Sequence, residues 1–327
     1  MHEILTSSAF HRVFRARLAA IARTDAVTVA ELVLVLANAI TVHDEELVSL
    51  IRTRARQLGL MNPYSHGDQH ILNYILDVDD PFSLIHHRTT SAGWKITFNE
   101  LRALRPPRDS RAAIHVNHRR FDPAAFNFNN VPGERFWSGQ FQHRHINLFF
   151  NKFPIEAYHS TIVPSPEDEQ PQYLEPHDHA LIWDLHAVLS HHQPHLIIGY
   201  NGHGAGESIN HLHFQLMPEA TGLKLLQPGA ADEYPIPVSV FRDSDRAWRH
   251  IHRLQTDNKA FNLIYAPGRM YVVERTYSGS HQTPSWTTGF AWWELAGGIL
   301  TVSEAAYKTL TDNQIAAVFS DMTPRNY

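Results

Sequence analysis

The hydrophobic pattern divides the chain into a first part with helical spacing and a longer part of short strands. Through residues 8–60 apolar residues recur every three to four positions, which predicts helices that bury one face. Ser8 is expected to cap the first helix, and Thr28 with Glu31 has capping-box spacing before the second. We therefore predict a mainly helical N-terminal region over residues 1–105.

A change of pattern follows the segment RPPRDS, which packs two prolines and three charges into six residues and favours a boundary. Beyond it, short apolar runs alternate with turns and one helical stretch. The predicted strands are HINLFFN (145–151), STIVP (160–164), HLIIGYN (195–201) and INHLHFQLM (209–217), with a helix over 177–192, a hairpin over 261–275 and a terminal helix over 303–320. This order predicts an antiparallel α+β domain with flanking helices.

Composition narrows the class of protein further. The 327 residues carry a net charge of −5, which gives no overall attraction to nucleic acid or to an anionic membrane. The chain has no cysteine, so disulfides, thiolate zinc sites and a cysteine nucleophile are excluded. The first residues lack a secretory apolar core, and we expect a soluble cytoplasmic protein.

Histidine is unusually abundant, with 24 residues. One interpretation is metal storage; the other is a set of surface or hydrogen-bonded residues with no shared role. The histidines are spread along the chain rather than gathered in a tract, which favours the second interpretation.

The stretch NGHGAGESINHLHFQLMP, residues 201–218, carries the clearest candidate chemistry. On an extended strand His211, His213 and Gln215 would share one face. The glycines before them allow a tight turn whose N–H groups can hold an anion, and Ser208 adds a hydroxyl donor. This combination suits a phosphate group.

Nucleophilic catalysis is the chemistry that such a site would support. A neutral imidazole can attack phosphorus and form a phosphoramidate, provided that one ring nitrogen is free and the other donates its proton to a fixed acceptor. A neighbouring histidine or a backbone carbonyl could be that acceptor. Two histidines separated by one residue are, taken alone, also typical of surface positions or metal ligands.

A family resemblance supports the catalytic interpretation. GESINHLHFQ resembles the signature of the histidine-triad superfamily, and its final Gln resembles the transferase and phosphorylase branch: galactose-1-phosphate uridylyltransferase, diadenosine tetraphosphate phosphorylase and the GDP-hexose phosphorylases. LIIGYNGHGAGESINHLHFQ is most similar to the GDP-L-galactose/GDP-D-glucose phosphorylases. NKFPIEAYHSTIVP (151–164) and RFDPAAFNFNNV (120–131) resemble two further segments of these proteins. The resemblance covers roughly residues 115–320.

The resemblance implies a histidine-triad-like antiparallel sheet with flanking helices over residues 106–327, in two halves at about 106–220 and 221–327. It implies catalytic roles for four residues of the motif. His213 would be the nucleophile, His211 would orient it, and Ser208 and Gln215 would hold the α-phosphate together with Gly206.

Other residues receive substrate-binding roles with open alternatives. Asn151 would face the ribose or cap its own turn, and His159 would lie near His211 or serve the structure alone. Asn201 would shape the phosphate loop, and Asn262 is a further candidate in the second half. Asn127 and Asn129 would border the base or form a core hairpin. Arg144 and Lys152 would face phosphates or solvent. His203 has no family role that we can assign; it would protonate the leaving group or contact the acceptor.

The sequence therefore predicts a nucleotidyltransferase that cleaves a GDP-hexose-like nucleoside diphosphate sugar through a nucleotidyl-histidine, with inorganic phosphate or a phosphorylated acceptor. The uridylyltransferases often hold zinc with two cysteines, which this chain lacks, so we expect no metal to be required, although histidines could still supply a zinc site. Alternatives are a dinucleoside polyphosphate phosphorylase or hydrolase, a non-catalytic nucleotide-binding module, and a histidine-rich metal binder. We expect no nucleic-acid or membrane partner, and relatives suggest a homodimer.

Overall fold

The computed structural model describes residues 1–57, 67–104 and 115–324. The predicted boundary at RPPRDS lies outside these residues. Within them the chain is a mixture of helices and antiparallel strands, as predicted.

Four helices make up most of the first part of the chain: α1 (Ser7–Arg23), α2 (Val29–Thr41), α3 (Glu45–Gln57) and α4 (Asp68–Asp77). Ser8 does not cap α1, because Thr6 precedes the helix and its hydroxyl accepts the Ala9 N–H at 3.3 Å. The predicted capping box is confirmed, since Glu31 accepts the Thr28 N–H at 2.8 Å. Because α1, α3 and α4 all contact it, α2 is buried on almost every side.

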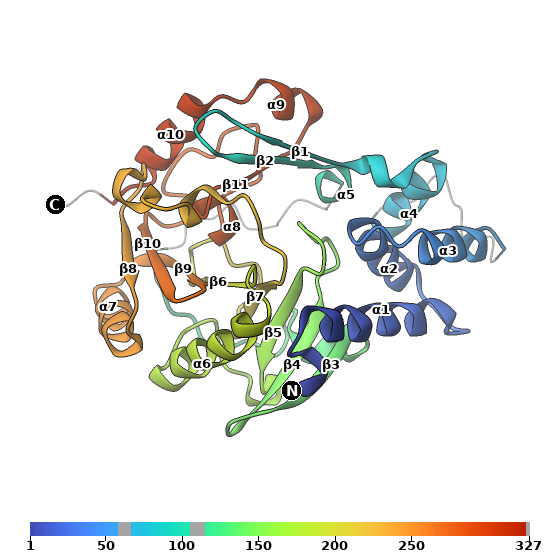
Figure 1. Cartoon of the computed structure of the whole chain (residues 1–327), viewed down its shortest axis with the longest axis horizontal. Coiled ribbons are helices and arrows are strands. Elements are labelled where there is room, and N and C mark those ends of the chain that lie inside the picture. Colours follow the sequence, from blue (N-terminus) through green and yellow to red (C-terminus); the bar gives the residue numbers. More distant parts are fainter. Residues whose placement is uncertain (58–66, 105–114, 325–327) are drawn as a thin grey trace.

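The main sheet has eight strands in the order β3-β4-β5-β7-β6-β9-β10-β8 (Figure 1). Their bounds are β3 (Arg135–Phe141), β4 (Arg144–Phe150), β5 (Ser160–Pro164), β6 (Ile197–Asn201), β7 (Phe214–Met217), β8 (Val238–Phe241), β9 (Ala260–Ala266) and β10 (Arg269–Arg275). Every pair in this sheet is antiparallel, which confirms the predicted class of fold.

A second, three-stranded sheet joins a hairpin before the main sheet to a strand after it in the sequence. The hairpin of β1 (Ile85–Thr89) and β2 (Lys95–Asn99) lies beside β11 (Gly298–Thr301), which pairs with β2 in parallel. The short helix α5 (Glu100–Ala103) follows β2 directly. Figure 1 shows this hairpin running from the side of α4 to the region of α9 (Glu304–Thr309) and α10 (Asp312–Asp321). The predicted terminal helix is therefore two helices, and Thr311 caps the second of them.

The remaining helices lie against the main sheet. A helix–strand–strand order occurs twice, first as α6 (Pro176–His192), β6 and β7, then as α7 (Ser244–Thr256), β9 and β10. The short helix α8 (Trp292–Leu295) packs on β6 and β9. A Cβ atom at Gly199 would lie 2.0 Å from the Trp292 ring, so this close packing requires glycine in β6. Short 3-10 helices span His2–Ile4, Pro81–Leu84, Phe128–Asn130, Pro132–Glu134, Pro166–Asp168, Lys224–Leu226 and Ala230–Glu233.

The strand predicted over 209–217 is shorter than expected. Only Phe214–Met217 forms β7, and both histidines of the motif lie in irregular backbone before it. The reason is a change of hydrogen-bond partner. The Leu212 N–H donates to the Gln170 carbonyl at 2.8 Å, and the His213 N–H donates to the Gln172 side chain at 2.9 Å, so neither belongs to the sheet ladder.

Among the described residues, no helix has both the length and the apolar character that spanning a membrane requires.

Two buried histidines predict that the fold loses stability in acid. Burial lowers the pKa of His179 and of His186 from 6.5 to about 4. Between these two pH values the unfolded chain binds more protons, so the free energy of unfolding falls as the pH drops from 6.5 towards 4. At pH 5 we expect a loss on the order of 2 kcal/mol for each histidine. Urea unfolding at pH 7 and pH 5 measures this loss.

The variant His186→Gln is the matched control for this prediction. Its amide can still donate to the Leu196 carbonyl, which lies 3.2 Å from the His186 ring nitrogen, but it does not titrate. The stability of this variant should fall less steeply with pH than that of the wild type. An equal slope in both proteins would contradict the assignment.

Candidate functional site

The glycine-rich turn begins where β6 ends at Asn201. Gly204 and Gly206 have positive φ angles of 73° and 94°, which glycine adopts without strain. A Cβ atom at Gly206 would also lie 2.6 Å from the Phe290 carbonyl oxygen, so no larger residue fits there. Ser208, at the end of the turn, is exposed. The turn is therefore packed tightly on one side and open at Ser208.

The second half of the domain holds this turn in place. The Asn262 amide donates to the Asn201 side-chain oxygen at 2.7 Å and to the Ala205 carbonyl at 2.8 Å. The Trp292 N–H donates to the same Asn201 oxygen at 2.7 Å, and the Ser278 N–H donates to the Gly204 carbonyl at 2.8 Å. Asn201 and Asn262, both buried, thus act as anchors of the turn.

His213 has the tautomer that a nucleophilic imidazole needs. Its Nδ1 lies 2.8 Å from the His211 carbonyl oxygen, which can only accept, so Nδ1 carries the proton and Nε2 keeps its lone pair. Burial lowers the pKa of His213, although the carbonyl bond and the nearby Glu207 carboxylate oppose this effect. The ring is therefore neutral at pH 7, and only 3% of the residue is exposed.

The His211 ring is fixed by backbone groups. The Phe128 N–H donates to its Nδ1 at 3.2 Å, so the proton of the neutral ring lies on Nε2, and a hydrogen bond with the Pro166 backbone stabilises the charged form. Burial nevertheless lowers the pKa of His211 to about 4, and the adjacent His213 acts in the same direction. The rings of Phe121 and Phe128 pack against His211, with centroids 5.0 Å and 5.6 Å away.

Gln215 contacts two of the predicted substrate-binding residues. The His159 Nδ1 accepts the Ile155 N–H at 3.1 Å, so its Nε2 carries the proton and donates to the Gln215 oxygen at 2.5 Å. The Asn151 amide lies 3.4 Å from the same oxygen. Because both contacts use the oxygen, the NH₂ group of the half-buried Gln215 remains a donor for a ligand.

His159 therefore lies against Gln215. Asn151 has two roles, because its side-chain oxygen also accepts the Phe153 N–H at 3.0 Å and so caps its own turn. The side chains of Asn127 and Asn129 are hydrogen-bonded to backbone groups. The Asn127 oxygen accepts the Asn129 N–H at 3.0 Å, and the Asn129 amide donates to the Pro166 carbonyl at 3.0 Å.

Arg144 and Lys152 are partly buried, and both form ion pairs. Arg144 lies 2.6 Å from the fully buried Asp178 carboxylate, and Lys152 lies 2.6 Å from the Asp68 carboxylate. Each cation is thus paired with a carboxylate from a distant element.

Gln172 is a residue that the sequence did not indicate. Its amide donates to the Asn201 carbonyl at 2.9 Å and to the His213 carbonyl at 3.1 Å, and its oxygen accepts the His213 N–H. It is 1% exposed. Gln172 thus joins the start of the glycine turn to the backbone of the candidate nucleophile, although nothing in the segment QPQYLEP marks it.

His203 and Glu207 form a close, covered contact within the glycine turn. The His203 Nδ1 is 2.8 Å from the Glu207 carboxylate, and both side chains are almost fully covered. Glu207 also acts electrostatically on the buried Arg275, whose guanidinium donates to the Phe290 carbonyl at 2.5 Å. His203, which had no assigned role, is thus the partner of a carboxylate close to His213.

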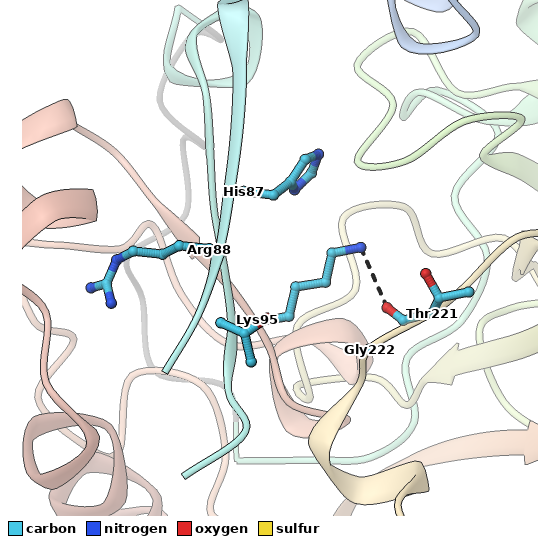
Figure 2. Close-up of a pocket in the computed structure, with 6 residues that line it drawn as sticks. His87, Arg88, Lys95, Thr221 and Gly222 are labelled. Carbon is cyan, nitrogen blue, oxygen red and sulfur yellow. Dashed lines mark hydrogen bonds between the residues drawn. The ribbon is translucent and has the colours of Figure 1, made fainter. Parts of the chain in front are cut away.

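Two hollows on the described surface are lined by residues outside this motif. Each has a volume of about 400 Å³, and Thr221 and Gly222 line both. Figure 2 shows the first hollow, where Lys95 reaches the Thr221 carbonyl and Arg88 points to the other side of the hairpin. Within the described residues no group of three or more His, Cys, Asp or Glu side chains is placed to hold a metal ion.

Comparison with known proteins finds relatives of the segment that contains the motif. Residues 89–217 match the family model described as GDPGP1-like, N-terminal domain. The predicted resemblance is confirmed. GDP-D-glucose phosphorylase 1 of Bos taurus is 38% identical over 102 residues, and that of Homo sapiens is 34% identical over 118 residues. These matches cover 28% and 33% of this chain but only 26% and 29% of the two relatives.

A solved structure shares the fold over a longer range. Yeast Ap4A phosphorylase Apa2, in complex with Ap4A, aligns with 83% of this chain and 94% of its own, with a TM-score of 0.50 and 17% identity. This likeness shows a shared fold and agrees with the predicted antiparallel α+β class. The named relatives are phosphorylases.

Gln172 allows a test of how the site is held. Gln172→Met keeps the shape of the side chain and removes three hydrogen bonds to buried backbone groups. We expect it to lower the free energy of unfolding by about 2–4 kcal/mol. Urea unfolding measures the change, with the exposed Gln57→Met as the control, for which we expect less than about 0.5 kcal/mol. Equal effects would show that the buried amide does not hold the site.

Proposed function

We propose that this protein is a nucleotidyltransferase of the phosphorylase type, which cleaves a GDP-hexose-like nucleoside diphosphate sugar. The observation that carries the proposal is the state of His213: a neutral ring, with Nδ1 hydrogen-bonded to a backbone carbonyl and Nε2 unprotonated. The segment that contains it matches the GDPGP1-like domain, and its relatives are named GDP-D-glucose phosphorylase.

In the first step the Nε2 lone pair of His213 forms a bond to the α-phosphorus. The bond from that phosphorus to the bridging oxygen breaks, and the oxygen leaves with the electron pair as hexose 1-phosphate. The turn N–H groups, the Ser208 hydroxyl and the Gln215 NH₂ would stabilise the negative charge on the phosphoryl oxygens. The His211 carbonyl would stabilise the positive charge that the ring gains, because it accepts the hydrogen bond from Nδ1–H throughout.

In the second step an oxygen of inorganic phosphate attacks the same phosphorus. The phosphorus–nitrogen bond breaks, its electron pair returns to Nε2, and the nucleoside diphosphate is released. Water in place of phosphate would make the enzyme a hydrolase. His213 is 3% exposed, and the Phe128 ring lies beside its ring, with centroids 5.4 Å apart.

A substrate screen tests this function. The purified protein is incubated with GDP-hexoses, other nucleoside diphosphate sugars and diadenosine tetraphosphate, each with and without phosphate, and products are identified by mass. We expect phosphate-dependent release of nucleoside diphosphate from a sugar substrate. Turnover of diadenosine tetraphosphate alone would favour the dinucleoside polyphosphate alternative. Tight nucleotide binding without turnover would favour a non-catalytic module.

The variant His213→Asn should remove both turnover and the covalent adduct, because the amide cannot act as the nucleophile. Trapping labelled nucleotide on the denatured protein measures the adduct, and thermal unfolding checks that the variant is folded. The exposed His143→Asn is the control and should retain the label. Full activity in His213→Asn would exclude the mechanism.

We propose that the reaction requires no metal ion, because backbone amides and side-chain donors supply the charge stabilisation. Activity of protein purified without a histidine tag should stay within about twofold after treatment with EDTA and removal of the chelator. A loss that added Zn²⁺ restores would contradict this proposal.

A further inference from the structure

We propose that the N-terminal region is a clamp that positions Gln215 for catalysis. The clamp consists of Arg15, Asn38, Asp68, Lys95, Asn99 and Arg102, and it acts on the turn of residues 151–158 between β4 and β5. This inference rests on the proposed function for its catalytic consequence, whereas its structural part can be tested separately.

A continuous set of hydrogen bonds connects this turn to Gln215. The Ile155 N–H donates to Nδ1 of His159 and so places the imidazole proton on Nε2. That proton is donated to the Gln215 oxygen, at 2.5 Å. The position of one backbone N–H in the turn therefore determines which end of the Gln215 amide is left to contact a phosphate.

The segment of β2 and α5 holds the backbone on the N-terminal side of Ile155. The Asn99 amide donates to the Pro154 carbonyl at 3.0 Å, and Arg102 donates to the Phe153 carbonyl. On the other side, Lys95 forms an ion pair with Glu156 at 2.5 Å, and both side chains are largely covered. Lys95 also lines the hollow in Figure 2, and its charge is already paired with Glu156.

The helices before β1 hold the two ends of the same turn. The buried Asn38 of α2 donates to the Asn151 carbonyl at 2.9 Å, and Asp68 at the start of α4 pairs with Lys152. At the other end, Arg15 of α1 donates to the Tyr158 hydroxyl at 3.1 Å.

Tyr158 shows that this end of the turn needs support. Its φ angle is 60°, a left-handed conformation that is uncommon for a bulky residue and persists when the surroundings impose it. The His11 ring stacks on the Tyr158 ring, with centroids 3.7 Å apart and planes 2° apart. Tyr158 directly precedes His159, so α1 fixes the direction from which the imidazole approaches Gln215.

Two variants test the clamp. Asn99→Ser keeps a side-chain oxygen that can cap α5 but is too short to reach the Pro154 carbonyl. Arg102→Ala removes the donor to Phe153, and Arg102→Lys keeps one. We expect Asn99→Ser and Arg102→Ala to lower the single-turnover rate of nucleotidylation about tenfold or more, with the KM for the nucleotide sugar changed less than about threefold. Arg102→Lys should recover part of the rate.

A spectroscopic measurement follows the structural step directly. The NH₂ signals of Gln215 and the ring ¹⁵N signals of His159 should shift in Asn99→Ser and Arg102→Ala relative to the wild type. Arg52→Ala is the control, because Arg52 donates to the Leu76 and Val78 carbonyls within the N-terminal region and has no bond to the turn. It should leave these signals and the rate unchanged.

The outcomes separate the two proposals. Unchanged Gln215 and His159 signals in the clamp variants would overturn the clamp whether or not the protein is active. Shifted signals with an unchanged rate in an active enzyme would overturn its catalytic role. An equal loss of rate in Arg52→Ala would show that any damage to the N-terminal region has this effect, which also contradicts the clamp. Absence of a nucleotidyl adduct in the wild type would instead overturn the proposed function.

Discussion

The hydrogen bond from His213 Nδ1–H to the His211 carbonyl is the interaction on which the candidate chemistry depends. It links two residues that are two positions apart in the chain, so a small rotation of the backbone would break it. The rotation is opposed on both sides, because Leu212 N–H is bonded to Gln170 and His213 N–H to Gln172. The acceptor is a backbone group, which cannot change its protonation, and the tautomer of His213 is thus determined by the main chain.

Buried amide side chains also hold the backbone of the candidate site in place. Gln172 and Asn262 satisfy backbone carbonyls where the chain turns from β6 towards β7. The Asn201 side chain connects Asn262 to the Trp292 N–H. A primary amide suits this task because it donates and accepts at one end of a short, uncharged side chain. Buried networks of this kind favour one arrangement over its neighbours, since a misplaced amide leaves polar atoms without partners.

The sequence predicted those features whose cause is local. Capping boxes, hairpins and the glycine turn depend on residues close together in the chain, and STIVP forms β5 over the predicted residues. The motif predicted the pair His211 and His213 because its spacing is local as well. The family resemblance added the prediction that the enzyme is a phosphorylase.

Features that depend on distant residues were missed or misplaced. The contact of His159 with Gln215 was not predicted, because it arises where the tertiary fold places β5 beside β7. Gln172 could not be predicted, since the sequence does not distinguish a buried Gln in a loop from a solvent-exposed one. Arg144 and Lys152 were expected to be open to solvent or phosphate, but their carboxylate partners lie 34 and 84 positions away.

The two helix–strand–strand units differ in one feature that has a wider consequence. Between β6 and β7 the chain makes the long excursion of residues 202–213, whereas Pro267 and Gly268 alone join β9 to β10. A connection as short as the second leaves no backbone to spare for a cradle of amides. The first unit therefore carries the glycine-rich loop of the candidate site, and the second contributes the strand from which Asn262 holds that loop.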